Sequence, residues 1–188
     1  MILQNKVELY HASYTIIEKI DLLHCASGKD FGKGFYLTTS YEQACRFVRT
    51  ALGKAAKNGL KEIKDGTGFV SLFKFKGIED KSIEYYEFSG ADAEWLHCIA
   101  AHRKAGLLKT EIERWQKYDI LAGKIANDST NQVLTAYING LYGEIGSSKA
   151  DETAIQLLLP NKLSDQICFR TQKAVDTLSF EGYNTVEI

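Results

Sequence analysis

The sequence predicts a single domain with an α+β fold. Segments that alternate like β-strands occur near both ends of the chain, at residues 6–11 and 165–171, with helical patterns between them. This order favours sheets assembled from segments that are distant in the sequence. The 188 residues are 45% hydrophobic, which suffices for one core and is short for two ordinary domains. No repeat or low-complexity tract marks a boundary, so we expect one domain over residues 1–188.

Two segments with clear alternation predict strands in the first half of the chain. Residues 6–11 place Leu9 and His11 on one face, because successive side chains of a strand point to opposite sides. Residues 69–76, Phe-Val-Ser-Leu-Phe-Lys-Phe-Lys, alternate in the same way. The polar, lysine-rich stretch at residues 52–68 predicts a surface excursion between elements.

Residues 31–40, Phe-Gly-Lys-Gly-Phe-Tyr-Leu-Thr-Thr-Ser, form the segment around which we expect the rest of the chain to be arranged. Gly32 and Gly34 directly precede an aromatic and β-branched run at residues 35–39, which predicts a turn that leads into a strand. Glycine at such a turn lets the backbone approach a ligand closely. If the phenylalanine and leucine of this strand face the core, Tyr36 faces whatever the turn approaches.

The remaining elements follow from helical spacing, cap residues and short apolar runs. Ser40 is the expected N-cap of a helix over residues 41–52, and Gln43 closes a capping box. Gly106 and Pro160 mark the ends of two later helices. Further strands are expected at residues 85–88, 118–121 and 165–171, and further helices at residues 91–105, 129–141, 152–159 and 172–178.

Charge and composition argue against several classes of function. A net charge of −1 gives no overall electrostatic basis for binding nucleic acid. The lysines at residues 54–64 are expected to form a solvated helix face and loop. No apolar run approaches the roughly 20 residues of a membrane helix, and the N-terminus lacks a signal-peptide pattern. We therefore expect a cytoplasmic protein, although a toxin delivered by a leaderless route would have the same features.

The cysteines and histidines form neither a disulfide pattern nor a metal-binding pattern. The four cysteines are far apart and contain no CxxC pair, which predicts reduced, buried thiols. His97 and His102 are five residues apart, a spacing that keeps them off a shared helix face. We expect no bound metal. The cysteines are Cys25, Cys45, Cys98 and Cys168.

Three separated polar segments remain as candidates for chemistry, since the P-loop, GxGxxG, HExxH and GxSxG motifs are absent. Each is weak when taken alone. The segments are Tyr10-His11-Ala12-Ser13 at the end of the first strand, Gly32-Lys33-Gly34-Phe35-Tyr36 at the start of the next, and Asp165-Gln166 at the start of a late strand.

Together these segments resemble the three-part signature of the ADP-ribosyltransferase superfamily, in the His-Tyr-Glu branch that includes diphtheria toxin and the poly(ADP-ribose) polymerases. The chain is also similar to an uncharacterised bacterial family of single-domain members, at residues 29–44, 118–128 and 165–171. These blocks span nearly the whole chain in order, and residues 52–66 match none. The resemblance implies two packed, mainly antiparallel sheets with an NAD cleft between them and helices at the flanks.

The resemblance also implies a role for each matching residue. His11 and Ser13 would bind the ribose and the nicotinamide amide of NAD, and Tyr36 would stack on the nicotinamide ring. These groups suit a reaction whose transition state resembles an oxocarbenium ion, because the ribose and the leaving ring must both be held in place. No metal is implied. The full set implied for NAD binding is Tyr10, His11, Ala12, Ser13, Gly32, Gly34, Phe35, Tyr36 and Ser40.

At the third position of the signature this sequence departs from the pattern, because Gln166 stands where the superfamily has Glu. Two apolar neighbours on the opposite strand face turn Gln166 toward the cleft, whereas a register shifted by one residue would make Asp165 the acid–base group. An amide can orient a ribose hydroxyl and cannot take a proton, which favours single transfer. Weaker stand-ins are Glu144 and Glu152, and residues expected at the rim of the site are Asn127, Asp128 and Asp165.

The function implied is a mono-ADP-ribosyltransferase that transfers ADP-ribose from NAD to a macromolecule and releases nicotinamide. The acceptor, whether protein, DNA or RNA, stays open. Domains of this kind resemble toxins, so an effector or a toxin with an antitoxin or immunity protein as partner is expected. The alternatives are an NAD glycohydrolase, an RNA 2′-phosphotransferase, which would need a more basic cleft, and a catalytically silent module that binds NAD or ADP-ribose.

Overall fold

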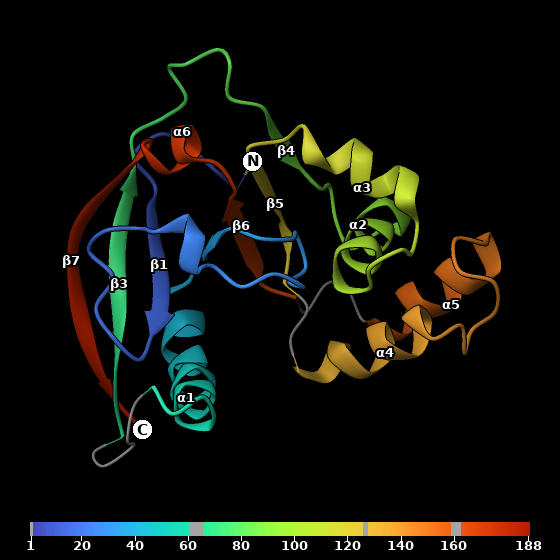
Figure 1. The fold of residues 1–188 in the computed structure, drawn as a ribbon, viewed down its shortest axis with the longest axis horizontal. Helices are drawn as coiled ribbons and strands as arrows, with labels where there is room; N and C mark the ends of the chain where they lie inside the picture. The colour runs from blue at the N-terminus through green and yellow to red at the C-terminus, as the bar shows by residue number, and fades with distance from the viewer. Residues whose placement is uncertain (1, 61–65, 126–127, 159–162) are drawn as a thin grey trace.

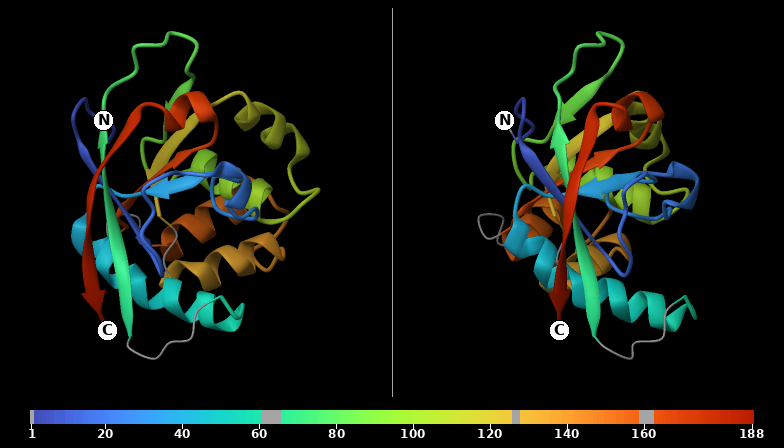
Figure 2. Two further views of the ribbon diagram at one scale, coloured as in Figure 1. Left: turned by 60° about the vertical axis from the view of Figure 1, so that its left-hand side comes forward. Right: turned by 90° about the vertical axis from the view of Figure 1, so that its left-hand side faces the viewer.

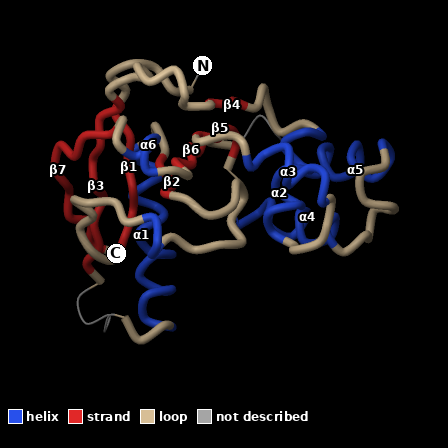
Figure 3. The backbone as a smooth tube through the Cα atoms, turned by 45° about the horizontal axis from the view of Figure 1, so that its top comes forward, coloured by secondary structure: helices blue, strands red, loops and turns tan. Residues whose placement is uncertain are grey.

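The computed structural model describes residues 2–60, 66–125, 128–158 and 163–188. Two sheets lie next to each other, and most of the helices gather on the far side of the second sheet (Figures 1 and 3). The first sheet is antiparallel with the order β1-β3-β7, and the second is mixed with the order β2-β6-β5-β4. The strands are β1 (Glu8–Ser13), β2 (Phe35–Leu37), β3 (Thr67–Phe75), β4 (Tyr85–Glu87), β5 (Ile120–Lys124), β6 (Asp165–Phe169) and β7 (Leu178–Glu187).

The two sheets pack together through the apolar residues that strand alternation predicted. Leu9 of β1 is fully buried, as are Ile167 and Phe169 of β6. The ring of Phe35 on β2 meets the ring of Phe73 on β3 edge to face, with centroids 5.5 Å apart. The α+β class with two sheets is therefore confirmed. The expectation of mainly antiparallel sheets is also confirmed among the described strands, where β4 and β5 form the one parallel pair.

Helix α1 (Tyr41–Lys57) lies against β1 and β3, as the two views in Figure 2 show. Its Val48 and Leu52 are buried in one cluster with Val70 of β3. The expected N-cap is confirmed, since Ser40 Oγ accepts from the backbone N–H of Gln43 at 3.2 Å. The reciprocal half of the capping box is absent. The side chain of Gln43 instead donates through Nε2 to the backbone carbonyl of Asp165 at 3.1 Å, which ties α1 to β6.

Four helices cover the other face of the second sheet. Trp95 and Ile99 of the central helix, α2, are fully buried there, in one cluster with Leu121 of β5 and Cys168 of β6. The indole Nε1 of Trp95 donates to the carbonyl of Lys124 at 2.9 Å, which fixes the helix against β5. The helices are α2 (Ala93–Arg103), α3 (Lys109–Gln116), α4 (Asp128–Ile138) and α5 (Ser148–Leu158).

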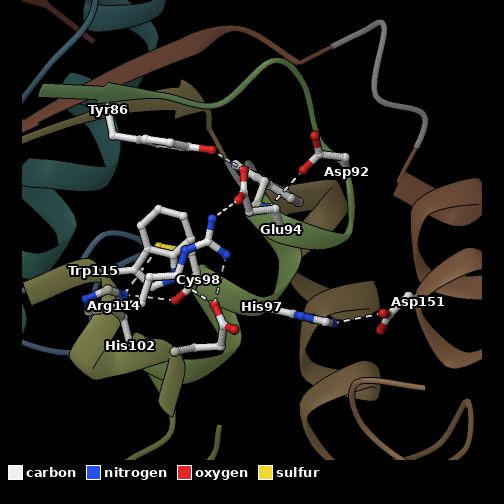
Figure 4. Close-up of polar contacts among 11 residues, drawn as sticks. Tyr86, Asp92, Glu94, His97, Cys98, His102, Arg114, Trp115 and Asp151 are labelled. Atoms are coloured by element: carbon white, nitrogen blue, oxygen red, sulfur yellow. Dashed lines mark hydrogen bonds and ion pairs between the residues drawn. The ribbon is translucent and has the colours of Figure 1, made fainter. Parts of the chain in front are cut away.

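Polar contacts hold this helical layer together (Figure 4). Asp92 caps α2 by accepting from the backbone N–H of Trp95 at 3.0 Å. His97 Nε2 lies 2.8 Å from Oδ2 of the buried Asp151, a contact that joins α2 to α5. Glu94 contacts the hydroxyl of Tyr86 and the guanidinium of Arg114. His97 is therefore explained as a structural residue.

Several predicted boundaries differ from the structure. The last predicted helix is the short α6 (Gln172–Val175), and the chain then forms β7, which the sequence did not indicate. Helix α3 was also not predicted. Helix α5 begins before its predicted start, and its predicted end at Pro160 lies outside the described residues. Within the described part of the chain, no helix has the length and apolar character to cross a membrane.

Candidate active site

A cavity of about 900 Å³ lies where β1, β2, α1 and the start of β6 meet. His11 from β1, Tyr36 from β2 and Gln166 from β6 all line it. The structure thus brings together three side chains that are separated by up to 155 positions, 166 − 11. Of the residues expected to bind NAD, those that line the cavity are Tyr10, His11, Ala12, Ser13, Gly34, Phe35 and Tyr36.

The junction between the two sheets places β1 beside β2 at this cavity. Tyr10 and Thr38 exchange two backbone hydrogen bonds, with N–H to carbonyl distances of 2.9 and 3.1 Å. This bridge links a strand of the first sheet to the end of β2 in the second. It also places the His11 side chain next to the backbone carbonyl of Tyr36.

His11 is held in a single orientation by its neighbours. Its Nδ1 lies 2.8 Å from the carbonyl oxygen of Tyr36, and its ring packs on Phe35 with centroids 4.3 Å apart. A carbonyl oxygen only accepts hydrogen bonds, so Nδ1 carries the proton in this contact. Burial lowers the pKa of His11, and the bond to the carbonyl opposes this only in part. At neutral pH the imidazole is therefore uncharged and Nε2 is an acceptor.

The hydroxyl of Tyr36 is occupied by the turn that precedes its own strand. It donates to the carbonyl of Gly32 at 2.8 Å and accepts from the backbone N–H of Phe31 at 2.9 Å. Burial is the main cause that raises the pKa of this phenol, so it stays protonated. The phenol therefore braces the glycine turn, and the part of Tyr36 that remains for a ligand is its ring.

Gly32 has a role that differs from the one expected. It does not line the cavity, and its backbone has a positive φ of +81° that favours glycine. A Cβ at this position would lie 2.6 Å from Cδ2 of His102, so the absence of a side chain is explained by packing on α2. Ser40 likewise lies outside the cavity lining and acts as the cap of α1.

The structure separates the two candidates for the third position of the site. Gln166 lines the cavity and is almost fully buried. Asp165 does not line the cavity. Its carboxylate is instead bound by Thr38 and Thr39, which directly follow β2. Its Oδ1 accepts from Thr38 Oγ1 and from the Thr39 N–H, both at 3.1 Å, and its Oδ2 accepts from Thr39 Oγ1 at 2.6 Å. The expectation that Asp165 lies at the rim of the site is therefore corrected.

Three polar residues that the sequence did not indicate also line the cavity, namely Asp30, Arg103 and Asn131. Asp30 is buried and its Oδ1 lies 2.6 Å from Arg103 Nη2. Arg103 Nη1 donates to Asn131 Oδ1 at 2.7 Å. Asp30 Oδ2 in turn accepts from Gln166 Nε2 at 2.8 Å, so a chain of polar contacts joins these residues to the predicted site.

An exposed aromatic ring on α1 was also missed. Phe47 lines the cavity with 43% of its surface exposed, and the ammonium of Lys54 lies 5.5 Å from the centre of its ring. An exposed ring of this kind offers a face on which a planar ligand can stack. Its helical position carried no signal, because a phenylalanine on an amphipathic helix is usually a core residue.

Two residues expected at the rim cannot be assigned to it. Asn127 lies outside the described residues, and Asp128 begins α4 without a described side chain. Of the weaker alternatives at the third position, Glu144 and Glu152 do not line the cavity. In the described ranges, no group of three or more His, Cys, Asp or Glu side chains is placed to hold a metal ion. The four cysteines are free thiols, as expected, but only Cys98 and Cys168 are buried, and Cys25 and Cys45 are half-buried, which corrects the prediction.

Comparison with known proteins gives one match. Neither the curated proteins nor the solved structures contain a significant match to this chain. The sequence model of the family described as "Protein of unknown function (DUF3990)" matches residues 7–180, which include every described strand that contributes to the cavity. The match covers most of the chain, and the chain therefore belongs to the DUF3990 family.

Proposed function

We propose that this protein is an NAD-dependent mono-ADP-ribosyltransferase. The observation that carries the proposal is the meeting of His11, Tyr36 and Gln166, from three distant strands, around one cavity of about 900 Å³. His11 and Tyr36 match the first two parts of the signature of the ADP-ribosyltransferase superfamily, and Gln166 stands at the third position, where the superfamily has Glu. A volume of this size is in the range of pockets that enclose small molecules and cofactors.

The contacts of His11 support a role in holding a sugar. With its proton on Nδ1, the imidazole offers Nε2 as an acceptor for a ribose hydroxyl. The ring of Tyr36, braced through its hydroxyl, and the exposed ring of Phe47 give the cavity aromatic faces for the nicotinamide and adenine rings. Ser13, at the end of β1, lines the same cavity and adds a hydroxyl group.

The proposed reaction breaks the bond between ribose C1′ and the nicotinamide nitrogen. Nicotinamide leaves with the bonding electron pair and becomes neutral, and C1′ acquires oxocarbenium character. A lone pair of the acceptor then bonds to C1′, and the acceptor loses its proton to water or to a base. Gln166 cannot take that proton, so the acceptor is one that is already nucleophilic or that another group activates.

Gln166 is also the reason for proposing that a single ADP-ribose unit is transferred to the macromolecule. A site that lacks a carboxylate at this position is poorly equipped to activate the hydroxyl of a growing ADP-ribose chain. We propose that the partners are therefore NAD and a macromolecular acceptor. A toxin or effector role, with an antitoxin or immunity protein as a further partner, rests on the resemblance alone.

The amide of Gln166 also favours a second candidate, a module that binds NAD or ADP-ribose without turnover. Hydrolysis of NAD, with water as acceptor, is an enzymatic alternative that would use the same site. These three functions share a binding site and differ only in what happens at C1′. A single experiment can therefore separate them.

The experiment incubates the purified protein with NAD labelled in its adenine half, with and without cell lysate. Transfer predicts free nicotinamide together with label on a macromolecule, and hydrolysis predicts nicotinamide with free ADP-ribose. The binding module predicts that NAD protects the protein from unfolding without release of nicotinamide. The His11→Ala variant should lose turnover by about a hundredfold, because the ribose is no longer positioned. Gln156→Glu, an exposed change on α5, is the control.

Release of nicotinamide by the His11→Ala variant at the rate of the unmodified protein would contradict the site assignment. Circular dichroism and an unfolding curve must show that the variant is folded. Absence of NAD binding by the unmodified protein would contradict the proposed function in all three forms.

A further inference from the structure

We propose that Asp30 is a positioning residue that fixes the amide of Gln166, so that Gln166 presents only a hydrogen-bond acceptor to the substrate. The proposal rests on the proposed function and adds to it the residue that sets how Gln166 meets a ribose hydroxyl. It also gives a role to the contact between Asp30 and Arg103 at the cavity.

The orientation of the Gln166 amide follows from its two neighbours. Nε2 lies 2.8 Å from Oδ2 of Asp30 and 3.1 Å from the carbonyl oxygen of Lys124. A carboxylate and a carbonyl only accept hydrogen bonds. The opposite orientation of the amide would place its oxygen against two other oxygens, so chemistry alone requires the NH₂ group to face them.

Both N–H groups of Gln166 are consumed by these contacts. An amide NH₂ has two hydrogens, and each has an acceptor here. The group of this amide that remains for a ligand is the carbonyl oxygen Oε1, which can only accept hydrogen bonds. At the cavity, Gln166 therefore has the hydrogen-bonding character of a glutamate without its charge.

Asp30 is itself held from a different element. Its Oδ1 accepts from Nε and Nη2 of Arg103, at 2.8 and 2.6 Å, and Arg103 stands at the end of α2. Both guanidinium nitrogens meet the same carboxylate oxygen, Oδ1, so the helix anchors this oxygen while Oδ2 accepts from Gln166. Asn131 of α4 accepts from the other end of the same guanidinium at 2.7 Å.

The polarity of the site selects the kind of group that can bind next to Gln166. An oxygen that only accepts pairs with an O–H or N–H donor and disfavours carbonyl and phosphate oxygens. His11 Nε2 is also an acceptor. NAD has such donors in its ribose hydroxyls and in the amino groups of nicotinamide and adenine. Of these, the 2′-hydroxyl of the nicotinamide ribose is nearest the bond that breaks, and we infer that it is the group bound by Gln166.

The Asp30→Asn variant tests this with almost no change in size. Arg103 holds the carbonyl oxygen of the new asparagine in the place of Oδ1, which puts its NH₂ group against the NH₂ of Gln166. Two donors repel, so we expect the Gln166 amide to give up its contact with the Lys124 carbonyl, turn over and present N–H groups to the cavity. Asp176→Asn, an exposed change at the end of α6, is the matched control.

The first measurement needs no ligand. Nitrogen-15 NMR of the side-chain amides should show the Gln166 NH₂ protected from hydrogen exchange in the unmodified protein and in Asp176→Asn, and less protected in Asp30→Asn. The Gln166 NH₂ resonance is identified as the signal that is missing from the spectrum of Gln166→Ala. Rapid exchange of both hydrogens in the unmodified protein would overturn the proposal, even if Asp30→Asn does not fold.

The second measurement titrates NAD and an analogue that lacks the 2′-hydroxyl of the nicotinamide ribose, by calorimetry. The unmodified protein and Asp176→Asn should bind the analogue about tenfold more weakly, the value of one hydrogen bond. Asp30→Asn should bind NAD more weakly and lose this discrimination. Equal ratios in Asp30→Asn and the unmodified protein would overturn the role of Asp30.

The two measurements also separate this proposal from the proposed function. A protected Gln166 amide together with no binding of NAD would overturn the proposed function, and with it the ribose hydroxyl as ligand. Binding of NAD without discrimination against the analogue would leave the proposed function standing and overturn the acceptor role of Gln166.

Discussion

Gly34 and Cys168 lie so close across the pair of strands β2 and β6 that a Cβ atom on Gly34 would be 2.5 Å from the Cys168 sulfur. The same Cβ would be 2.7 Å from the carbonyl oxygen of Phe169, which is backbone and cannot turn aside. Gly34 also lines the cavity. Gly34 is therefore required by the pairing of β2 with β6, whatever ligand the cavity holds.

The Gly34→Ala variant should be destabilised because the added methyl group overpacks this contact. We expect the free energy of unfolding to fall by about 1–3 kcal/mol, measured by urea denaturation. Gly53→Ala is the control, since Gly53 lies in α1 with nothing within 4 Å of an added Cβ. That change should stabilise the protein by about 0.5–1 kcal/mol. Equal stability of Gly34→Ala and the unmodified protein would contradict the close packing.

The candidate site could be predicted from sequence only where a local motif carried it. His11 and Tyr36 belong to short segments with recognisable neighbours, and alternation along β6 pointed Gln166, and not Asp165, at the cavity. Asp30 and Arg103 lie on a loop and a helix, 73 positions apart by 103 − 30. No spacing rule relates two such residues, because they meet only when α2 packs on the second sheet.

Removal of the Tyr36 hydroxyl should loosen the glycine turn. In Tyr36→Phe the carbonyl of Gly32 and the N–H of Phe31 lose their partner, which should cost about 1–3 kcal/mol of stability. Because the ring remains, we expect weakened NAD turnover and not its complete loss. Tyr183→Phe, on the exposed end of β7, is the matched control and should change neither property. Full stability of Tyr36→Phe would show that the turn does not depend on this hydroxyl.

Two half-buried histidines, His11 and His102, should make the protein less stable in mild acid. Burial lowers the pKa of His11 and of His102 below the usual value near 6.5. The unfolded chain therefore binds protons that the folded chain resists, and the free energy of unfolding should fall as the pH drops below about 6.5. Each histidine can add at most about 1.4 kcal/mol per pH unit.

Urea denaturation at several pH values between 7.5 and 5 measures this effect. His102→Gln should have a shallower dependence of stability on pH than the unmodified protein. The exposed His24, with 84% of its side chain accessible, gives the control variant His24→Gln, which should retain the original slope. A slope unchanged in His102→Gln would contradict the assignment of His102 as a group whose pKa is lowered in the folded protein.

The fold was predictable where burial leaves a pattern, and two elements left none. Strand β7 buries only Leu178, and the rest of its side chains are half-buried or exposed, so hydrophobic alternation is absent. Its existence depends on pairing with β3, which spans Thr67 to Phe75. Helix α3 follows Leu108, a residue with a positive φ of +47° and no side-chain cap, so the usual start signal is missing.

Substitution of Asp165 should separate a structural carboxylate from the residue beside it. Asp165→Asn replaces an acceptor that Thr38 and Thr39 bind with a group that is half donor, so stability should fall by about 1–3 kcal/mol. NAD turnover per folded molecule should stay the same, because Asp165 does not line the cavity. Gln166→Ala should show the reverse pattern, with NAD turnover per folded molecule lost. An acid–base role for Asp165 would appear as lost turnover in a folded Asp165→Asn.

A carboxylate at position 166 should work only at raised pH. In Gln166→Glu the new group faces the carboxylate of Asp30 and the carbonyl of Lys124, both of which were 2.8–3.1 Å from Nε2. Like charge and opposed acceptors disfavour ionisation, so the pKa of the new glutamate should lie well above its usual value near 4.3. We expect NAD hydrolysis by this variant to increase with pH between 6 and 9, measured as release of nicotinamide.

The double variant Asp30→Asn with Gln166→Glu provides the decisive comparison. The asparagine can donate to the new carboxylate while its oxygen stays on Arg103, which stabilises the ionised glutamate. The pH profile of hydrolysis should therefore move down by about one unit or more relative to the single variant. Gln156→Glu, exposed on α5, should leave the profile of the unmodified protein in place. Identical profiles for the single and double variants would mean that Asp30 does not act on position 166.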